Sequence, residues 1–258
     1  MNPTTNPAKE IGYLCRAMKT PQIAELAGPL AEQARTEHWS YEQYLAAVLG
    51  RQVATRTANG NRLRIAGAHF PQIKTLEDFD PSVLAARENE LLAHLATTTF
   101  VPRTENVVLL GPPGTGKTHL AIALGICAAN HSYPVFFDTA TGWINRLLAA
   151  HNTGTLDKEL RRLRRYRVLI IDEVGYIPFE AEAANLFFQL IANRYEHGTV
   201  IVTSNLAFSQ WGHTLGDDVI AAATIDRLIH HAHVLTMDGE SYRTRRYTTE
   251  EGSDFARR

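Results

Sequence analysis

Cysteine is nearly absent from this sequence. Cys15 and Cys127 are the only two among 258 residues. They are too few and too far apart for a disulfide framework or a four-ligand zinc site. This scarcity favours a reducing compartment, and we therefore expect a cytoplasmic protein.

Long apolar runs are also missing. The first ten residues, MNPTTNPAKE, lack the apolar core of a secretory signal, and no later stretch approaches the roughly 20 apolar residues that cross a bilayer. Hydrophobic residues still make up 45% of the chain, which is enough for the core of a larger domain and a small one. We expect neither export nor membrane insertion.

A strong charge of one sign is absent as well. The formal net charge is −1, so any affinity for nucleic acid must come from local basic clusters. His230, His231 and His233 lie close together but have no acidic or cysteine partner, so we predict no metal site there.

Two patterns of apolar residues divide the chain. Between Lys9 and Leu63 they recur at helical spacing, and Ser40 with Gln43 forms a capping box that begins the third helix. We expect the sequence 59–61 (Asn-Gly-Asn) to weaken or end that helix. Residues 1–75 are predicted to be a helical domain with its linker, and 76–258 a second domain.

The second domain alternates short β-rich runs with helical segments. Such buried runs are typical of a parallel sheet covered on both faces, so we predict the α/β class. The predicted strands are 106–110, 135–138, 168–172, 200–204 and 234–237.

A phosphate-binding loop follows the first predicted strand and precedes a helix. Its pattern is G-x-x-x-x-G-K-[ST], in which glycine-permitted turns point backbone N–H groups at phosphate oxygens. We predict that Lys117 contacts the β- and γ-phosphates of a nucleotide and that the Thr118 hydroxyl ligates Mg²⁺. The loop consists of Gly111, Pro112, Pro113, Gly114, Thr115, Gly116, Lys117 and Thr118.

Two carboxylates end the predicted strand 168–172. Asp172 is placed to bind Mg²⁺, and Glu173 to orient and deprotonate an attacking water, as a hydrolase requires. The alternative is that both acids only cap the next turn. The Asn-Lys-x-Asp signature of guanine-specific enzymes is missing, so we predict ATP as the nucleotide.

Together with Thr203-Ser204-Asn205 and Asp226-Arg227, these motifs resemble the AAA+ ATPases. The chain is most similar to the IstB group of insertion-sequence transposition helpers, which are related to DnaC-type helicase loaders. The likeness covers nearly the whole length, including the connector 74–80, the run 194–196 and the ending 239–243. It implies an AAA+ core after a helical amino-terminal domain. Because the chain ends at Arg258, we expect no carboxyl-terminal lid.

The resemblance also implies roles for three further residues. Asn205 would be the polar sensor that aligns the water, and Arg227 would enter the neighbouring subunit's ATP site in a homo-oligomer. Arg194 is a second candidate for this interface. The structural alternatives are a turn residue for Asn205, a surface ion pair for Arg227 and a purely structural role for Arg194.

Two arginine clusters are candidates for contacts with the DNA backbone. The first has no acidic residue among its members, and the second precedes the strand that ends at Asp172. A solvated surface is the alternative for either cluster. The candidates are Arg51, Arg56, Arg62 and Arg64, and then Arg161, Arg162, Arg164, Arg165 and Arg167.

These observations favour an ATP-dependent helper that assembles on target duplex DNA and recruits or stimulates the transposase of the same element. A DnaC-type helicase loader, bound to a replicative helicase and single-stranded DNA, is the alternative. The sequence leaves open which of Arg194 and Arg227 acts in trans, how many subunits assemble, and which residues contact the transposase.

Overall fold

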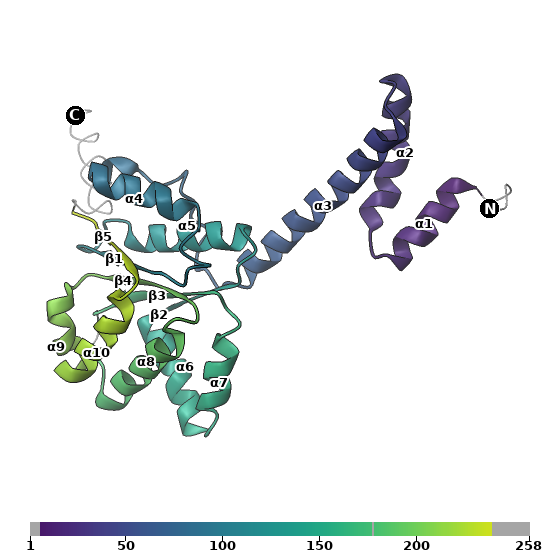
Figure 1. Cartoon of the computed structure of the whole chain (residues 1–258). Coiled ribbons are helices and arrows are strands. Elements are labelled where there is room, and N and C mark those ends of the chain that lie inside the picture. Colours follow the sequence, from purple (N-terminus) through teal and green to yellow (C-terminus); the bar gives the residue numbers. More distant parts are fainter. Residues whose placement is uncertain (1–5, 177, 239–258) are drawn as a thin grey trace, which may run out of the picture. The chain divides into compact units, whose positions relative to one another are not determined.

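The computed structural model describes residues 6–176 and 178–238, so the ending 239–243 lies outside the described residues. Contacts divide the chain into two compact units, Met1–Leu63 and Arg64–Arg258. Figure 1 labels the helices and strands of both units.

The first unit is helical, as predicted. A proline occupies the first turn of α1 (Pro7–Ala17) and of α2 (Pro21–Thr36), where its missing N–H costs no helical hydrogen bond. The capping box is confirmed: the Gln43 N–H donates to Ser40 Oγ over 3.2 Å, and the Ser40 N–H donates to Gln43 Oε1 over 2.7 Å.

The third helix, α3 (Tyr41–Ala66), continues through residues 59–61, so the predicted break is wrong. The last residues of this helix, from Arg64 on, belong to the second unit and are held by contacts within it. Arg64 Nε donates to the Ala129 carbonyl over 2.9 Å, and Ile65 packs against a hydrophobic core. Such contacts outweigh the roughly 1 kcal/mol that one glycine costs in a helix.

The boundary between the units, at residues 63–64, therefore precedes the boundary near Thr75 that the sequence suggested. Residues 67–75 belong to the second unit because they pack on its sheet. The Phe137 N–H donates to the Ala68 carbonyl over 2.8 Å, and the rings of Phe70 and Phe137 lie 6.1 Å apart. The segment that looked like a linker is thus part of the α/β domain.

A five-stranded parallel sheet forms the centre of the second unit, as predicted, with strand order β2-β3-β4-β1-β5 (Figure 1). The strands are β1 (Asn106–Leu110), β2 (Val135–Thr139), β3 (Val168–Val174), β4 (Thr199–Ser204) and β5 (Ala232–Thr236). The helices are α4 (Ala86–Ala96), α5 (Lys117–Asn130), α6 (Ala140–Asn152), α7 (Leu156–Leu163), α8 (Ala181–Arg194), α9 (Trp211–Leu215) and α10 (Asp218–Ile229), with 3-10 turns η1 (Pro81–Val83) and η2 (Phe208–Gln210).

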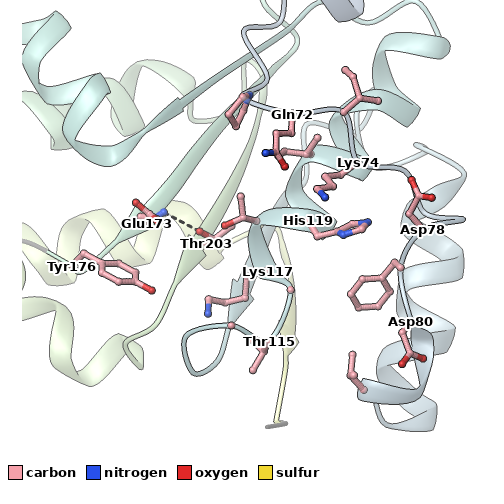
Figure 2. Close-up of a pocket in the computed structure, with 18 residues that line it drawn as sticks. Gln72, Lys74, Asp78, Asp80, Thr115, Lys117, His119, Glu173, Tyr176 and Thr203 are labelled. Atoms are coloured by element: carbon pink, nitrogen blue, oxygen red, sulfur yellow. Dashed lines mark hydrogen bonds between the residues drawn. The ribbon is translucent and has the colours of Figure 1, made fainter. Parts of the chain in front are cut away.

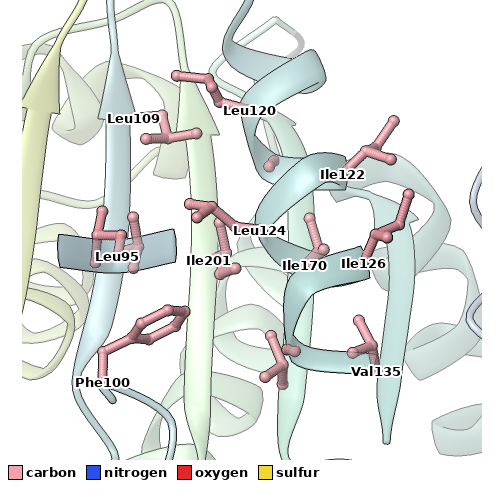
Figure 3. Packing of buried hydrophobic residues seen from close by; sticks show 14 of the residues in the cluster. Leu95, Phe100, Leu109, Leu120, Ile122, Leu124, Ile126, Val135, Ile170 and Ile201 are labelled. Carbon is pink, nitrogen blue, oxygen red and sulfur yellow. The ribbon is translucent and has the colours of Figure 1, made fainter. Parts of the chain in front are cut away.

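Each face of the sheet carries its own core. Helices α4 and α5 cover one face, and α6 to α10 cover the other (Figure 1). Strand β3 supplies both cores alternately, with Ile170 on the α5 side and Ile171 on the other. Figure 3 shows Leu120 and Leu124 of α5 against the strands. This packing fixes the amino terminus of α5 at the carboxyl edge of the sheet.

No helix in residues 6–176 and 178–238 has the length and apolar character needed to span a membrane.

Candidate nucleotide site

The loop between β1 and α5 depends on its glycines. Gly111, Gly114 and Gly116 have φ of 149°, 84° and 96°, values that residues with a side chain rarely adopt. A Cβ on Gly111 would lie 2.3 Å from the Met237 carbonyl oxygen. The chain therefore curls tightly before Lys117, and the first N–H groups of α5 are left to bind an anion.

Lys117 is almost completely buried at the start of α5, with 7% of its surface exposed. Its ammonium donates to the carbonyls of Gly111 and Pro112 over 2.7 and 2.6 Å. The side chain thus bends back over the loop that the sequence assigned to phosphate.

Asp172 lies opposite, at the carboxyl end of β3. The Thr118 hydroxyl donates to Asp172 Oδ1 and Oδ2 over 2.9 and 3.0 Å, and the Thr203 hydroxyl donates to Oδ1 over 2.6 Å. Burial raises the pKa of Asp172, while the hydrogen bonds from Thr203 and Thr118 and the nearby charge of Lys117 lower it. The negative charge of the buried carboxylate is therefore only partly compensated. A bound cation would stabilise this charge.

Glu173 adopts an unusual backbone conformation, with φ of 64°. The pairing between β3 and β4 shifts register between Ile171 and Val174, so the residue lies in an irregularity of the sheet. Its N–H donates to Thr203 Oγ1 over 2.9 Å, while its side chain is exposed. Strained residues of this kind concentrate at functional sites.

A cavity of about 780 Å³ brings these residues together (Figure 2). Its floor is the loop and the first turn of α5, one wall is the end of the sheet, and the other wall comes from residues 71–83. The connector 74–80 carried part of the family resemblance, but nothing in its sequence placed it or its neighbours at the nucleotide site. This second wall contains Pro71, Gln72, Ile73, Lys74, Asp78, Phe79, Asp80 and Val83.

The second wall is attached to α5 by specific contacts. His119 Nε2 lies 2.8 Å from the Thr75 carbonyl oxygen, and the rings of Phe79 and His119 meet edge to face at 5.6 Å. Phe79 would lie 3.0 Å from a Cβ placed on Gly116. The wall therefore touches the phosphate loop itself.

Asn205 follows β4 but is not among the described residues that line the cavity. Its Oδ1 is buried without a hydrogen-bond partner in the described part of the chain.

The comparisons with known proteins agree with this geometry. The family described as IstB-like ATP binding protein matches residues 14–249. The chain belongs to this family. A protein of insertion sequence IS5376 from Geobacillus stearothermophilus, named for ATP binding, is 39% identical over 94% of this chain and 97% of its own length. Another, of insertion sequence IS21 from Pseudomonas aeruginosa, is 41% identical over 91% of this chain and 88% of its own.

Two solved structures share the fold of this IstB-like chain. One is the replication initiator DnaA bound to AMPPCP and single-stranded DNA, with a TM-score of 0.55 and 18% identity. It covers 67% of this chain, and this chain spans only 52% of it. Another is the DnaC helicase loader, with a TM-score of 0.50, 19% identity, and coverage of 67% of this chain and 98% of that one. The predicted AAA+ P-loop fold is confirmed.

The donors in the IstB-like site fit Mg²⁺. Hard oxygen ligands suit this ion, and Thr118 and Asp172 place a hydroxyl and a buried carboxylate within 3.0 Å of each other. Their roles as ligands stay a prediction.

The structure separates the two arginines proposed for a subunit interface. Arg194 has 1% of its surface exposed and donates to the carbonyls of Tyr166 and Arg167 over 2.9 and 3.0 Å. Burial lowers its pKa to about 10. This side chain is buried and bonded within its own chain, which favours the structural alternative for Arg194.

Arg227 is half-exposed on α10. Its guanidinium lies 4.7 Å from the centroid of the Phe188 ring, and Nη1 donates to the Ala223 carbonyl over 2.9 Å. These contacts orient the side chain without neutralising its charge. Of the two candidates, only Arg227 keeps a position from which it can meet another subunit.

The predicted DNA-binding arginines also differ in their surroundings. Arg64 is half-buried and binds the carboxyl end of α5, and Arg162 pairs with Glu159 over 2.7 Å. Arg164 is exposed but donates to Asn193 Oδ1 over 3.1 Å, and Arg167 is half-buried. The candidates that remain exposed, apart from Arg164, are Arg51, Arg56, Arg62, Arg161 and Arg165.

Proposed function

We propose that this chain is a Mg²⁺-dependent ATPase of the cytoplasm that assembles on target duplex DNA and recruits or stimulates the transposase of the same insertion sequence. One observation carries the proposal: Lys117, Thr118 and Glu173 line a single cavity, and Thr118 bonds Asp172. Membership of the IstB-like family supports the link to insertion sequences.

In the proposed reaction, the oxygen of a water forms a bond to the γ-phosphorus as the bond from that phosphorus to the ADP oxygen breaks. Glu173 accepts the water proton, and Asn205 helps to align the water. Lys117 contacts the β- and γ-phosphates in place of the carbonyls of Gly111 and Pro112. Mg²⁺, when bound by Thr118 and Asp172, neutralises phosphate charge.

Completion of the site by a neighbour is the second part of the proposal. A guanidinium stabilises the charge that develops on the transferred phosphoryl group, and Arg227 is the half-exposed candidate for this contact. Hydrolysis therefore depends on a homo-oligomer, which DNA helps to assemble.

For DNA itself, the exposed arginines provide contacts with the phosphate backbone, without base readout. The DnaC likeness concerns the fold alone and gives no support to a helicase partner for this chain, whereas the insertion-sequence relatives match nearly the whole length. Duplex target DNA is therefore the substrate that we favour.

A gel shift with duplex DNA, with and without ATP, tests ATP control. Lys117→Ala removes the phosphate contact and should abolish ATP-dependent retention, whereas the exposed Lys9→Ala of α1 should behave as the unaltered chain. Undiminished retention by Lys117→Ala would refute control by ATP.

Glu173→Gln tests the base. This variant should bind ATP normally, lose at least about a hundredfold in turnover, and hold the ATP-bound assembly on DNA. Normal turnover would remove Glu173 from the role of base.

The DNA contacts are tested by the double variant Arg161→Ala/Arg165→Ala. It should weaken binding on every duplex alike and reduce the slope of log affinity against log salt by about 2, because roughly 0.9 counterion is released per phosphate contact. Arg162→Ala, whose guanidinium already pairs with Glu159, is the matched control. Equal losses in both would argue against a phosphate contact at Arg161 and Arg165.

A further inference from the structure

Tyr176 occupies an unexpected place for an aromatic residue. It lines the nucleotide cavity together with Lys117, Thr118 and Glu173, and 49% of its surface is exposed. Figure 2 shows the ring extending from the turn after β3, with its hydroxyl directed into the cavity toward the side of Lys117. No sequence motif pointed to this residue.

The turn that carries Tyr176 packs closely against the residues that follow β4. Gly175 has φ of 104°, and a Cβ on it would lie 2.8 Å from Leu206 Cδ1 and 3.3 Å from Asn205 Oδ1. The chain therefore passes tightly against the end of β4. Val174 is fully buried. Glu173 before it and Tyr176 after it both line the cavity.

The direction of a bound nucleotide follows from the two walls of the cavity. In the proposed ATPase, the loop and the α5 amino terminus bind the phosphates at the floor, and Glu173 lines the cavity at the sheet edge. The terminal phosphate must lie beside Glu173, because this residue acts on the water that attacks it. The rest of the nucleotide then extends toward residues 71–83, away from Tyr176.

We propose that the Tyr176 hydroxyl donates a hydrogen bond to a γ-phosphate oxygen. The inference rests on the proposed ATPase function. A phenol is a neutral donor at pH 7, so it can bind one γ-phosphate oxygen while the Lys117 ammonium contacts the β- and γ-phosphates. ADP has no oxygen at this place, and Tyr176 therefore distinguishes ATP from ADP.

Discrimination by a hydrogen bond to a charged group has a predictable size. Loss of one such bond weakens binding by about tenfold or more. Tyr176 also fixes the γ-phosphate relative to the water at Glu173, so its hydroxyl contributes to turnover as well as to affinity.

Tyr176→Phe tests the inference in the full chain, because it removes only the hydroxyl. Calorimetric titrations with Mg²⁺ and either AMPPCP or ADP should show an approximately tenfold loss for AMPPCP and no change for ADP. The single-turnover rate with ATP should fall by a similar factor. Tyr13→Phe, a 66% exposed tyrosine of α1, removes a phenolic hydroxyl outside the cavity and should change neither affinity.

Each other outcome is informative. Equal affinity of Tyr176→Phe and the unaltered chain for AMPPCP overturns the inference, as does an equal loss for AMPPCP and ADP. If the unaltered chain itself binds neither nucleotide, or binds ATP without hydrolysing it, the proposed ATPase function fails instead. The two failures are thus distinguished by the unaltered protein alone.

Discussion

The buried carboxylate of Asp172 lowers the stability of the folded protein when no ligand is bound. In the folded chain burial raises the pKa of Asp172 above its ordinary value of 3.8, and the hydrogen bonds from Thr203 and Thr118 offset only part of this effect. The folded state thus binds the proton more tightly than the unfolded chain. The free energy of unfolding consequently falls as pH rises through this raised pKa, and stays lower above it.

Asp172→Asn should therefore stabilise the protein when no nucleotide is present. The amide keeps an oxygen that accepts the hydrogen bonds of Thr118 and Thr203 but carries no charge. Scanning calorimetry at pH 7 should show a higher Tm, by about 2–4 °C for each kcal/mol gained, and the gain should shrink as pH falls toward 4. Stabilisation by ATP with Mg²⁺ should disappear in the same variant. A lower Tm at pH 7 would mean that the charge of Asp172 benefits the free fold.

Arg194, in contrast to Asp172, stabilises the folded protein. Removal of this side chain leaves the Tyr166 carbonyl without the donor that Arg194 provides, whereas the Arg167 carbonyl still accepts from the Thr199 N–H. It also opens a cavity beside Gly198, where a Cβ would overlap with Arg194 Nη2.

Arg194→Ala should reduce the free energy of unfolding by about 3–5 kcal/mol in urea titrations. Arg227→Ala, which loses a contact with the Phe188 ring, should cost about 0.5–1 kcal/mol. Similar losses in the two variants would contradict the different placements of these arginines.

At the scale of elements, α3 continues past a sequence that favours a break. Gly50 lies inside this helix, and no atom lies within 4 Å of a Cβ placed on it. Gly50→Ala should raise the free energy of unfolding of the helical unit by about 0.5–1 kcal/mol, because glycine has the larger backbone entropy in the unfolded chain. Circular dichroism during thermal unfolding measures this change. A loss of stability would indicate that Gly50 contacts another molecule closely.

Most elements could be predicted from local patterns, and the exceptions have a common cause. The strands of the sheet were predicted because buried β-rich runs are distinctive, and the phosphate loop because its spacing is specific. The continuation of α3 and the inclusion of Ala68 and Phe70 in the second unit depend on contacts with α5 and β2, which are distant in sequence. No local pattern reports such contacts.

The same reasoning explains what was missed in the site. Thr203 donates to Asp172 and accepts from the Glu173 N–H, yet the motif Thr203-Ser204-Asn205 pointed to Asn205 and gave no sign of these two contacts. Tyr176 and the wall at 71–83 enter the cavity only because of the turn geometry and the packing on α5. By contrast, Lys117, Thr118, Asp172 and Glu173 could be named because chemistry restricts their types and order.

At the scale of the whole molecule, catalysis by Arg227 in trans can be separated from catalysis within one chain. Lys117→Ala has a defective site but still supplies Arg227, and Arg227→Ala has an intact site but supplies no arginine. Each variant alone should hydrolyse ATP poorly, and an equimolar mixture on duplex DNA should recover a measurable part of the rate, up to about a quarter if subunits mix at random. Phosphate release measures this recovery. A mixture no more active than its components would place Arg227 outside the neighbour's site.

Because the ammonium of Lys117 folds back onto the loop, a ligand must be long enough to reach it there. Without nucleotide its charge is already satisfied by two backbone oxygens, so a ligand gains from this lysine only after displacing them. In the proposed complex Lys117 contacts the β- and γ-phosphates, which adenosine and AMP lack. Neither of these ligands should therefore displace the two carbonyls, and the protein should respond to the phosphates of a nucleotide instead of to its adenine base.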